Sequence, residues 1–242
     1  MVTDIQKDTP RKAEGVAAVD RALSILHALE QARTPLTISD LSRATGLYKS
    51  TALRLLGSLR KHGHVVREED GRYALGPALL RLGMVYQHNS RLDEKLMPIF
   101  RRLVAAGSES PSFFVRQGEA ERLCVFRLDS NHSTLDRIRT GIVLPLDRGA
   151  AGHIISAFGA RAEGDLYDRV RAEGVAVSMS ETSPDCAAVA APVFDERDTL
   201  AGALSISGPR LRFDAEGKET QLSHLREAAA ETCRVFGGRY PF

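Results

Sequence analysis

The chain has 242 residues, 43% hydrophobic and 26% charged, which is the composition of a globular protein long enough for two modest domains. Its formal net charge is only +2, and no apolar run approaches the roughly 20 residues needed to span a bilayer. The polar N-terminus lacks the apolar region of a signal peptide, and the three scattered cysteines lack metal-binding spacing. We therefore expect a cytoplasmic protein with reduced thiols and with neither a membrane anchor, a metal nor a cofactor.

Residues 1–15 are polar and are expected to form a disordered leader. From Val16 to Gln31 apolar side chains recur at helical spacing, which predicts an amphipathic helix. Its apolar stripe consists of Val19, Ala22, Leu23, Leu26 and Leu29. Arg33-Thr34-Pro35 ends this helix, and Leu36 is expected to pair as a short strand with a later hairpin.

A basic segment without a single acidic residue runs from Leu41 to Arg67. Its basic residues are Arg43, Lys49, Arg54, Arg60, Lys61 and Arg67. Asp40 stands just before the segment, and the acidic run 68–70 follows it directly. Because the whole chain is nearly neutral, this separation of charge indicates a negatively charged partner.

The same segment has the pattern of two short helices joined by a turn. Thr37 and Asp40 match a capping box, which starts a short helix with Leu41 and Ala44 facing inward. Gly46 supplies the left-handed residue that ends it. A second helix is predicted from Tyr48 to His62, with its apolar face formed by Ala52, Leu55, Leu56 and Leu59.

A hairpin is predicted directly after the second helix, with residues 65–67 and 72–75 as strands and Asp70-Gly71 in the turn. Two helices followed by a hairpin form a winged helix-turn-helix, which we place at residues 16–76. The alternative is an ordinary helical hairpin with a solvated basic face. The side chains expected to contact bases or phosphates are Arg43, Lys49, Ser50, Thr51, Arg54, Arg67 and Arg72.

Residues 77–91 are helical and rather apolar, which is typical of a linker helix whose exposed side packs on another subunit. The rest of the chain, residues 92–242, mixes strand and helix patterns. Strands are expected at 112–116, 123–127, 134–139, 175–179, 187–194 and 200–207. Helices are expected at 92–107, 149–158, 164–172 and 213–236, the last capped by Asp214. This order predicts an α+β domain with an antiparallel sheet.

Two segments of this second domain contain small and polar residues suited to a ligand. Residues 148–152 precede a helix, where free backbone N–H groups favour an anion or a carbonyl, although a plain tight turn is the alternative. Ser205 and Ser207 point to one face of a strand, although that face could simply be a solvent-exposed edge. Phe113, Phe114 and Phe126 are core candidates that could also line a pocket.

Long ordered motifs resemble the IclR family of bacterial transcriptional regulators. The run from Val19 to Gly83 carries DRAL-x-IL, PLT-x-x-x-L, GL-x-KST-x-x-RLL and GRY-x-LG, and the similarity continues through APVFDERDTLAGALSISGP. The resemblance implies a GAF-like sensor fold for the C-terminal domain and an effector pocket between the two segments described above. Carried over, the effector-binding positions are Ala150, Ala151, Gly152, Ser178, Ala188, Ser205 and Ser207.

The sequence departs from the family members that bind small keto-acids. Ser178 stands where they have Asp, Ala188 where they have Cys, and His153 where the loop usually has Lys. The segment between Ala160 and Gly174 is also short. These differences favour a more open or more apolar pocket, for a carboxylate or an aromatic metabolite. His153 near Ser205 is the one pair with catalytic potential, but no GxSxG or HExxH motif is present and we expect no enzyme activity.

Together these features predict a DNA-binding regulator, by analogy a repressor, whose affinity for a double-stranded operator is modulated by an effector. We expect a homodimer or a dimer of dimers on a pseudo-palindromic site. The alternative is a small-molecule sensor or enzyme-like module that uses its winged helix for protein contacts.

Overall fold

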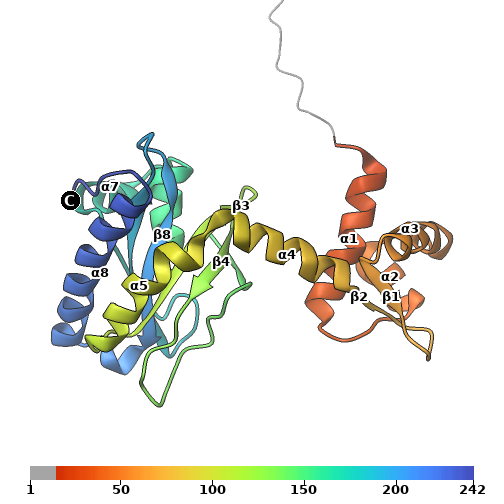
Figure 1. Ribbon diagram of the computed structural model, residues 1–242, viewed down its shortest axis with the longest axis horizontal. Coiled ribbons are helices and arrows are strands. Elements are labelled where there is room, and N and C mark those ends of the chain that lie inside the picture. The colour runs from red at the N-terminus through yellow and green to blue at the C-terminus, as the bar shows by residue number, and fades with distance from the viewer. Residues whose placement is uncertain (1–14) are drawn as a thin grey trace, which may run out of the picture. The chain divides into compact units, whose positions relative to one another are not determined.

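The computed structural model describes residues 15–242, so nearly all of the predicted leader lies outside the described residues. The chain divides into two compact units, the first ending at Ser90 and the second running from Arg91 to Phe242 (Figure 1). Within the described residues, no helix is both long and apolar enough to cross a membrane.

The first unit contains four helices and a two-stranded sheet in the described residues. In chain order they are α1 (Ala17–Ala32), α2 (Ile38–Thr45), α3 (Lys49–Lys61), β1 (Val65–Arg67), β2 (Tyr73–Leu75) and α4 (Pro77–Ser90). This is the predicted winged helix-turn-helix, with the linker helix after it. Leu36 forms the expected bridge, pairing with Tyr73. The core is made by Ile25, Leu29, Leu41, Ala52, Leu56, Val65 and Tyr73.

The start and end of α2 follow the local sequence. The Thr37 hydroxyl accepts the Asp40 N–H (3.2 Å), and the Asp40 carboxylate accepts the Thr37 N–H (3.2 Å), so both halves of the capping box are present. Gly46 ends the helix with φ 69°, a left-handed conformation that glycine adopts without a steric penalty. These two signals fix the length of α2 and therefore the point at which α3 begins.

Three details of this unit differ from the sequence prediction. Val19 and Leu23 of the expected stripe are 54% and 47% exposed, whereas Ile25 is fully buried. Ala44 is also exposed, and α2 contributes Leu41, which is fully buried, and Ile38, which is partly buried, to the core. The second wing strand begins at Tyr73 rather than at Arg72, so the wing tip spans residues 68–72, and within it only Gly71 has a positive φ.

The second unit is built on a six-stranded antiparallel sheet in the order β5-β4-β3-β8-β7-β6. Its strands are β3 (Ser110–Gln117), β4 (Glu121–Arg127), β5 (Val143–Pro145), β6 (Ala176–Met179), β7 (Cys186–Phe194) and β8 (Leu200–Pro209). Its helices are α5 (Leu92–Ala105), α6 (Ala150–Ile154), a π-helical turn η1 (Ile155–Gly159), α7 (Asp165–Glu173), a 3-10 turn η2 (Arg210–Arg212) and α8 (Ala215–Val235). The α+β prediction is confirmed, and Asp214 caps α8 as expected.

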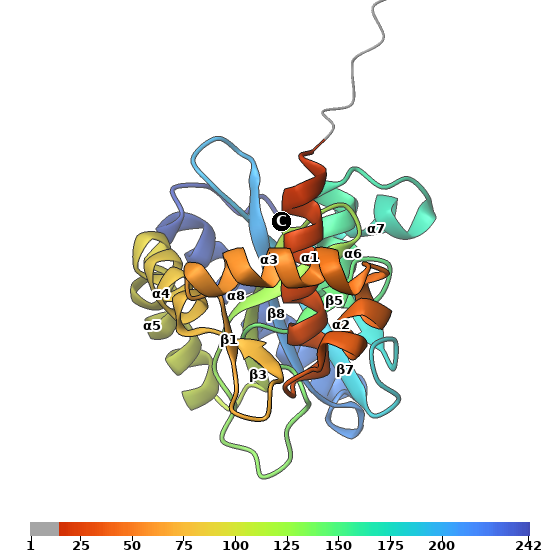
Figure 2. The same cartoon turned by 90° about the vertical axis from the view of Figure 1, so that its right-hand side faces the viewer.

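Helices pack on both faces of this sheet (Figures 1 and 2). Helices α5 and α8 cover one face, and α6 with α7 covers the other. Alternation along β8 assigns its side chains to these faces: Leu204 and Ile206 lie under α5 and α8, whereas Ala203 and Ser205 face α6. The central strand therefore contributes to a core on one side and to a polar cavity on the other.

One predicted strand is wrong. Residues 134–139 are irregular rather than a strand, and the short β5 (Val143–Pro145) pairs with β4 instead. The reason is local: the Asp136 carboxylate accepts the N–H of Ile138 (3.0 Å), a side-chain-to-backbone bond that competes with a ladder bond. Asp136 is thereby turned inward rather than toward solvent.

Candidate functional site

The outer face of α3 presents polar side chains that are free to contact a partner. Lys49, Ser50 and Arg54 are exposed, and Thr51 is half-buried. Within the described part of the chain, none of these four side chains forms a hydrogen bond or an ion pair. On the opposite face, Ala52 and Leu56 anchor the helix in the core. A rigidly held helix with an uncompensated polar face has the form that enters a DNA major groove.

The other predicted contact residues flank this helix and already have weak partners. Arg43 lies 3.4 Å from Asp40, and Arg72 lies 3.3 Å from Asp70. Arg67 donates from Nε to the Gly71 carbonyl (3.3 Å). All three guanidinium groups are exposed. Because exposed ion pairs contribute little to stability, replacing the present partners of these arginines by DNA phosphate oxygens would cost little free energy. These three guanidinium groups are thus available to an external partner.

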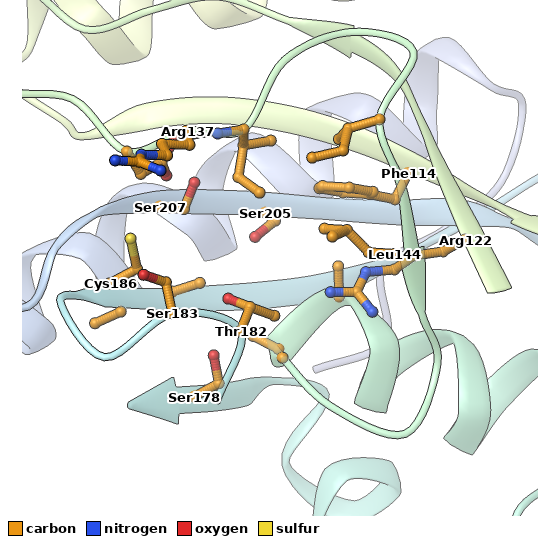
Figure 3. Close-up of a pocket in the computed structure, with 18 residues that line it drawn as sticks. Phe114, Arg122, Arg137, Leu144, Ser178, Thr182, Ser183, Cys186, Ser205 and Ser207 are labelled. Carbon is orange, nitrogen blue, oxygen red and sulfur yellow. Dashed lines mark hydrogen bonds between the residues drawn. The ribbon is translucent and has the colours of Figure 1, made fainter. Parts of the chain in front are cut away.

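The second unit contains a cavity of about 280 Å³ on the α6 side of the sheet (Figure 3). This volume lies just below the roughly 300–1,000 Å³ range of ligand pockets, so the cavity suits a small metabolite. Six of the seven effector positions line it, namely Ala150, Ala151, Ser178, Ala188, Ser205 and Ser207. Gly152 does not line it.

The two serines of β8 face the cavity, and the solvent-edge alternative is wrong because β8 lies in the middle of the sheet. Ser205 donates from Oγ to the Val189 carbonyl (3.0 Å). Ser207 Oγ accepts from Nη1 of Arg127 (3.3 Å). Both hydroxyls keep the capacity to accept a further hydrogen bond. The hydroxyl of Ser178 has no hydrogen-bonding partner among the described residues.

The turn before α6 already holds a carboxylate from the chain. Glu181 Oε2 accepts the Gly149 N–H (2.6 Å) and lies 2.7 Å from Nε2 of His153. The anion preference expected at residues 148–152 is therefore met internally at Gly149. The predicted pairing of His153 with Ser205 is wrong, because the imidazole is directed to Glu181 and lies outside the cavity lining.

Arg122 of β4 is a cavity residue that the sequence analysis missed. It is 2% exposed, and its Nη1 donates to the carbonyls of Pro145 and Arg148 (2.9 Å for the latter). No carboxylate among the described residues lies within ion-pair distance, and Nε is buried without a partner. Burial lowers the pKa of Arg122 to about 10, and the more distant Asp147 and Glu181 oppose that shift.

Gly152 acquires its role from Arg122. A Cβ at residue 152 would lie 2.7 Å from Nη1 of Arg122 and 2.6 Å from the Leu146 carbonyl oxygen. Both distances are shorter than a real contact allows, so only glycine leaves room for the guanidinium. Gly152 thus affects the cavity indirectly, by leaving space for the Arg122 side chain that lines it.

Asp136 forms a second charged part of the cavity wall. Its Oδ1 accepts from Nη2 of Arg127 (2.7 Å), and its Oδ2 is buried without a hydrogen-bonding partner in the described chain. Both side chains of this ion pair are almost fully buried. Among the aromatic candidates, Phe114 lines the cavity, whereas Phe113 and Phe126 pack on the α5 side.

The cavity can bind and orient a small molecule through hydroxyls, a guanidinium and a carboxylate, against an apolar wall. Its apolar part is formed by Phe114, Ile138, Ile142, Leu144, Ala150, Ala151, Ala187 and Ala188. Within residues 15–242 no cluster of His, Cys, Asp or Glu could hold a metal ion. The arrangement is that of a binding site in which polar groups fix the orientation of a mostly apolar ligand.

Comparisons with known proteins match stretches of both units. The model of the IclR helix-turn-helix domain matches residues 18–69, and that of the bacterial transcriptional regulator IclR C-terminal domain matches residues 165–234. The glycerol operon regulatory protein of Streptomyces griseus is 32% identical over 256 residues, covering 94% of this chain and all of that protein.

Two further relatives add detail. The HTH-type transcriptional repressor AllR of Salmonella typhi is 23% identical, covering 96% of this chain and 94% of that protein. The crystal structure of an IclR homologue from Microbacterium hydrocarbonoxydans, complexed with 4-hydroxybenzoate, superposes with a TM-score of 0.74 at 20% identity, covering 91% of this chain and 99% of that one. The chain belongs to the IclR family of DNA-binding bacterial transcriptional regulators.

Proposed function

We propose that this protein represses transcription by binding a pseudo-palindromic operator, and that a small effector in the second unit changes its operator affinity. The observation that carries the DNA-binding part is the outer face of α3. There the side chains of Lys49, Ser50, Thr51 and Arg54 form no hydrogen bond or ion pair with any described residue, inside a segment that contains no acid. Arg43, Arg67 and Arg72 would contact phosphates beside them.

Homodimerisation is proposed from exposed apolar side chains of the first unit. Val16, just before α1, and Val19 and Leu23 on α1 are exposed, and on α4 most of the large apolar residues are exposed in a nearly continuous run. That run consists of Leu80, Leu82, Met84, Val85 and Tyr86. A second copy of the chain would cover such surfaces. A two-fold dimer, or a dimer of dimers, would match half-sites separated by whole helical turns.

The effector is proposed to be a small carboxylate or aromatic metabolite held by the cavity on the α6 side of the sheet. Ala150, Ala151, Ser178, Ala188, Ser205 and Ser207 would contact it, with Gly152 behind the wall. The relative crystallised with 4-hydroxybenzoate supports an aromatic acid as a model compound. Binding without chemistry is the proposed role, since His153 is engaged with Glu181. The site of action would be the bacterial cytoplasm, where the DNA is.

The DNA-binding surface is tested with a duplex that the wild-type protein selects from a random library. Arg54→Ala should weaken binding by about 1–3 kcal/mol at fixed salt. Arg101→Ala is the matched control, because Arg101 is an exposed arginine of the second unit without a partner in the described chain. Equal affinities of the two variants would contradict the assignment of α3.

The salt dependence of the same assay separates DNA binding from protein contacts. When a protein neutralises DNA phosphates, the logarithm of its binding constant falls linearly with the logarithm of the salt concentration. Retardation of the duplex should therefore be strong at low salt and fall steeply as the salt concentration rises. No retardation at low salt would refute the regulator function and favour a module that uses its winged helix for protein contacts.

A further inference from the structure

The cavity in the second unit has two buried charged groups with unused hydrogen-bonding capacity, and they lie at different places on its wall. Arg122 is on β4 beside Leu144, whereas Asp136 belongs to the loop that precedes β5. In Figure 3 Arg122 and Leu144 lie at one end of the cavity, and Arg137, which follows Asp136 in the chain, lies at the other.

Arg122 has no carboxylate within ion-pair distance among the described residues, and Asp147 and Glu181 act on it only from farther away. Its Nη1 is engaged by two backbone carbonyls, but Nε is buried without an acceptor and Nη2 makes no hydrogen bond to any described residue. The guanidinium lies over the Phe114 ring, 5.5 Å from its centroid, which positions it without neutralising it. Burying a cation without an ion-pair partner costs free energy. An anionic ligand in the cavity would provide that partner for the Arg122 guanidinium.

The other arginines near the cavity do not have this property. Arg127 is buried but already pairs with Asp129 (2.8 Å) and Asp136 (2.7 Å). Arg137 is exposed, so water solvates its charge. Arg122 is therefore the side chain against which an anionic group would gain most.

Asp136 requires the opposite kind of group. Its Oδ1 is occupied by Arg127 and by the Ile138 N–H, whereas Oδ2 is buried and accepts nothing from the described residues. An unsatisfied buried acceptor is rare in folded proteins. A hydroxyl or amino group on the ligand would donate to it.

We propose that the ligand is a small organic anion whose carboxylate or phosphate pairs with Arg122 and whose hydroxyl or amino group donates to Asp136. This assignment rests on the proposed effector function of the cavity. The apolar side chains of Ile138 and Ile142 would cover the middle of such a ligand. The cavity volume of about 280 Å³ restricts it to a small molecule.

Matched probes test the two ends separately. The full-length protein is titrated by calorimetry with 4-hydroxybenzoate, with 4-hydroxybenzamide, which lacks the charge, and with benzoate, which lacks the donor. Glycerol 3-phosphate, compared with glycerol, forms a second series that distinguishes phosphate from carboxylate. In at least one series the anion should bind about tenfold or more tightly than its neutral partner, as expected for a hydrogen bond to a charged group.

Variants then assign that preference to the two residues. Arg122→Gln should bring the anion and its neutral partner to nearly equal affinity, whereas Arg122→Lys, which keeps the charge, should retain most of the preference. Asp136→Asn should remove the preference for 4-hydroxybenzoate over benzoate. Arg139→Gln, an exposed arginine outside the cavity lining, is the matched control and should change neither ratio. Each ratio is measured within one protein, so a general loss of stability cancels.

Three outcomes would overturn the assignment: no binding of either anion at millimolar concentration, tighter binding of the neutral partners, or unchanged ratios in Arg122→Gln and Asp136→Asn. The DNA-binding assay distinguishes failure of the ligand assignment from failure of the proposed regulator function. A neutral compound that binds and releases the operator leaves the effector function in place but refutes the pairing with Arg122. The expected ratios in a protein that binds no DNA refute the regulator function alone.

Discussion

The loop between β6 and β7 is tied to the start of α6 by one carboxylate, and Glu181→Ala removes that tie. In the wild type, Glu181 accepts the Gly149 N–H (2.6 Å) and lies 2.7 Å from His153 Nε2. Hydrogen bonds to charged groups contribute about 1.5–3 kcal/mol each when buried. Because Glu181 is 34% exposed, we expect about 2 kcal/mol in total rather than the sum of two buried bonds.

For a domain of this size, 1 kcal/mol corresponds to about 2–4 °C in melting temperature, so Glu181→Ala should lower Tm by about 4–8 °C. Differential scanning calorimetry measures this shift. The Tm of Glu181→Gln should lie between those of the wild type and Glu181→Ala, because the amide oxygen of the glutamine still accepts the Gly149 N–H. Glu163→Ala is the control, since Glu163 is exposed and has no partner in the described chain. If the Tm of Glu181→Ala lay within about 1 °C of that of Glu163→Ala, the contacts of Glu181 with Gly149 and His153 would contribute nothing measurable to stability.

Three further predictions concern caps and thiols. Thr37→Ala removes the cap of α2 and should lower the free energy of unfolding by about 1 kcal/mol in urea titrations. Hydrogen bonds from Thr37 hold the pKa of Asp40 below its usual value, so the part of the cap that depends on the Asp40 carboxylate should be complete above about pH 4 and lost as pH falls through the lowered pKa, as acid titration by circular dichroism would record. Burial raises the pKa of all three thiols, that of Cys124 to about 12, but only Cys186 is half-buried rather than buried, so a thiol reagent should modify Cys186 of the native protein and leave Cys124 and Cys233 unmodified until denaturation.

The parts of the fold that the sequence predicts well are those with local causes. A capping box, a glycine stop and helical spacing are all visible within a few residues, and α2 and α3 form where these signals place them. The exposure of Val19 was not predictable, because it depends on which side of α1 is covered by α2 and α3 rather than on the spacing within α1.

The cavity was predictable only in part, for the same reason. Alternation along β8 places Ser205 and Ser207 on one face, which is a local property of a strand. Arg122 shares a strand face with the buried Cys124, which is a signal that the sequence contains. Its burial depends on the distant segment from Leu146 to Gly152, which folds over it. Asp136 was assigned to a strand because polar and apolar residues alternate around it. That alternation does not reveal the hydrogen bond between the Asp136 carboxylate and the Ile138 N–H.

The alternation along β8 also determines how freely the specificity of this protein can change. Leu204 and Ile206 are fully buried against the α5–α8 layer, whereas Ser205 and Ser207 border the cavity. If the cavity binds the effector as proposed, substitutions at the two serines should therefore alter ligand preference without reaching the packing that keeps the domain folded. A biosensor for a new metabolite is best sought by randomising positions 205 and 207 together with 178 and 188, with 204 and 206 held constant.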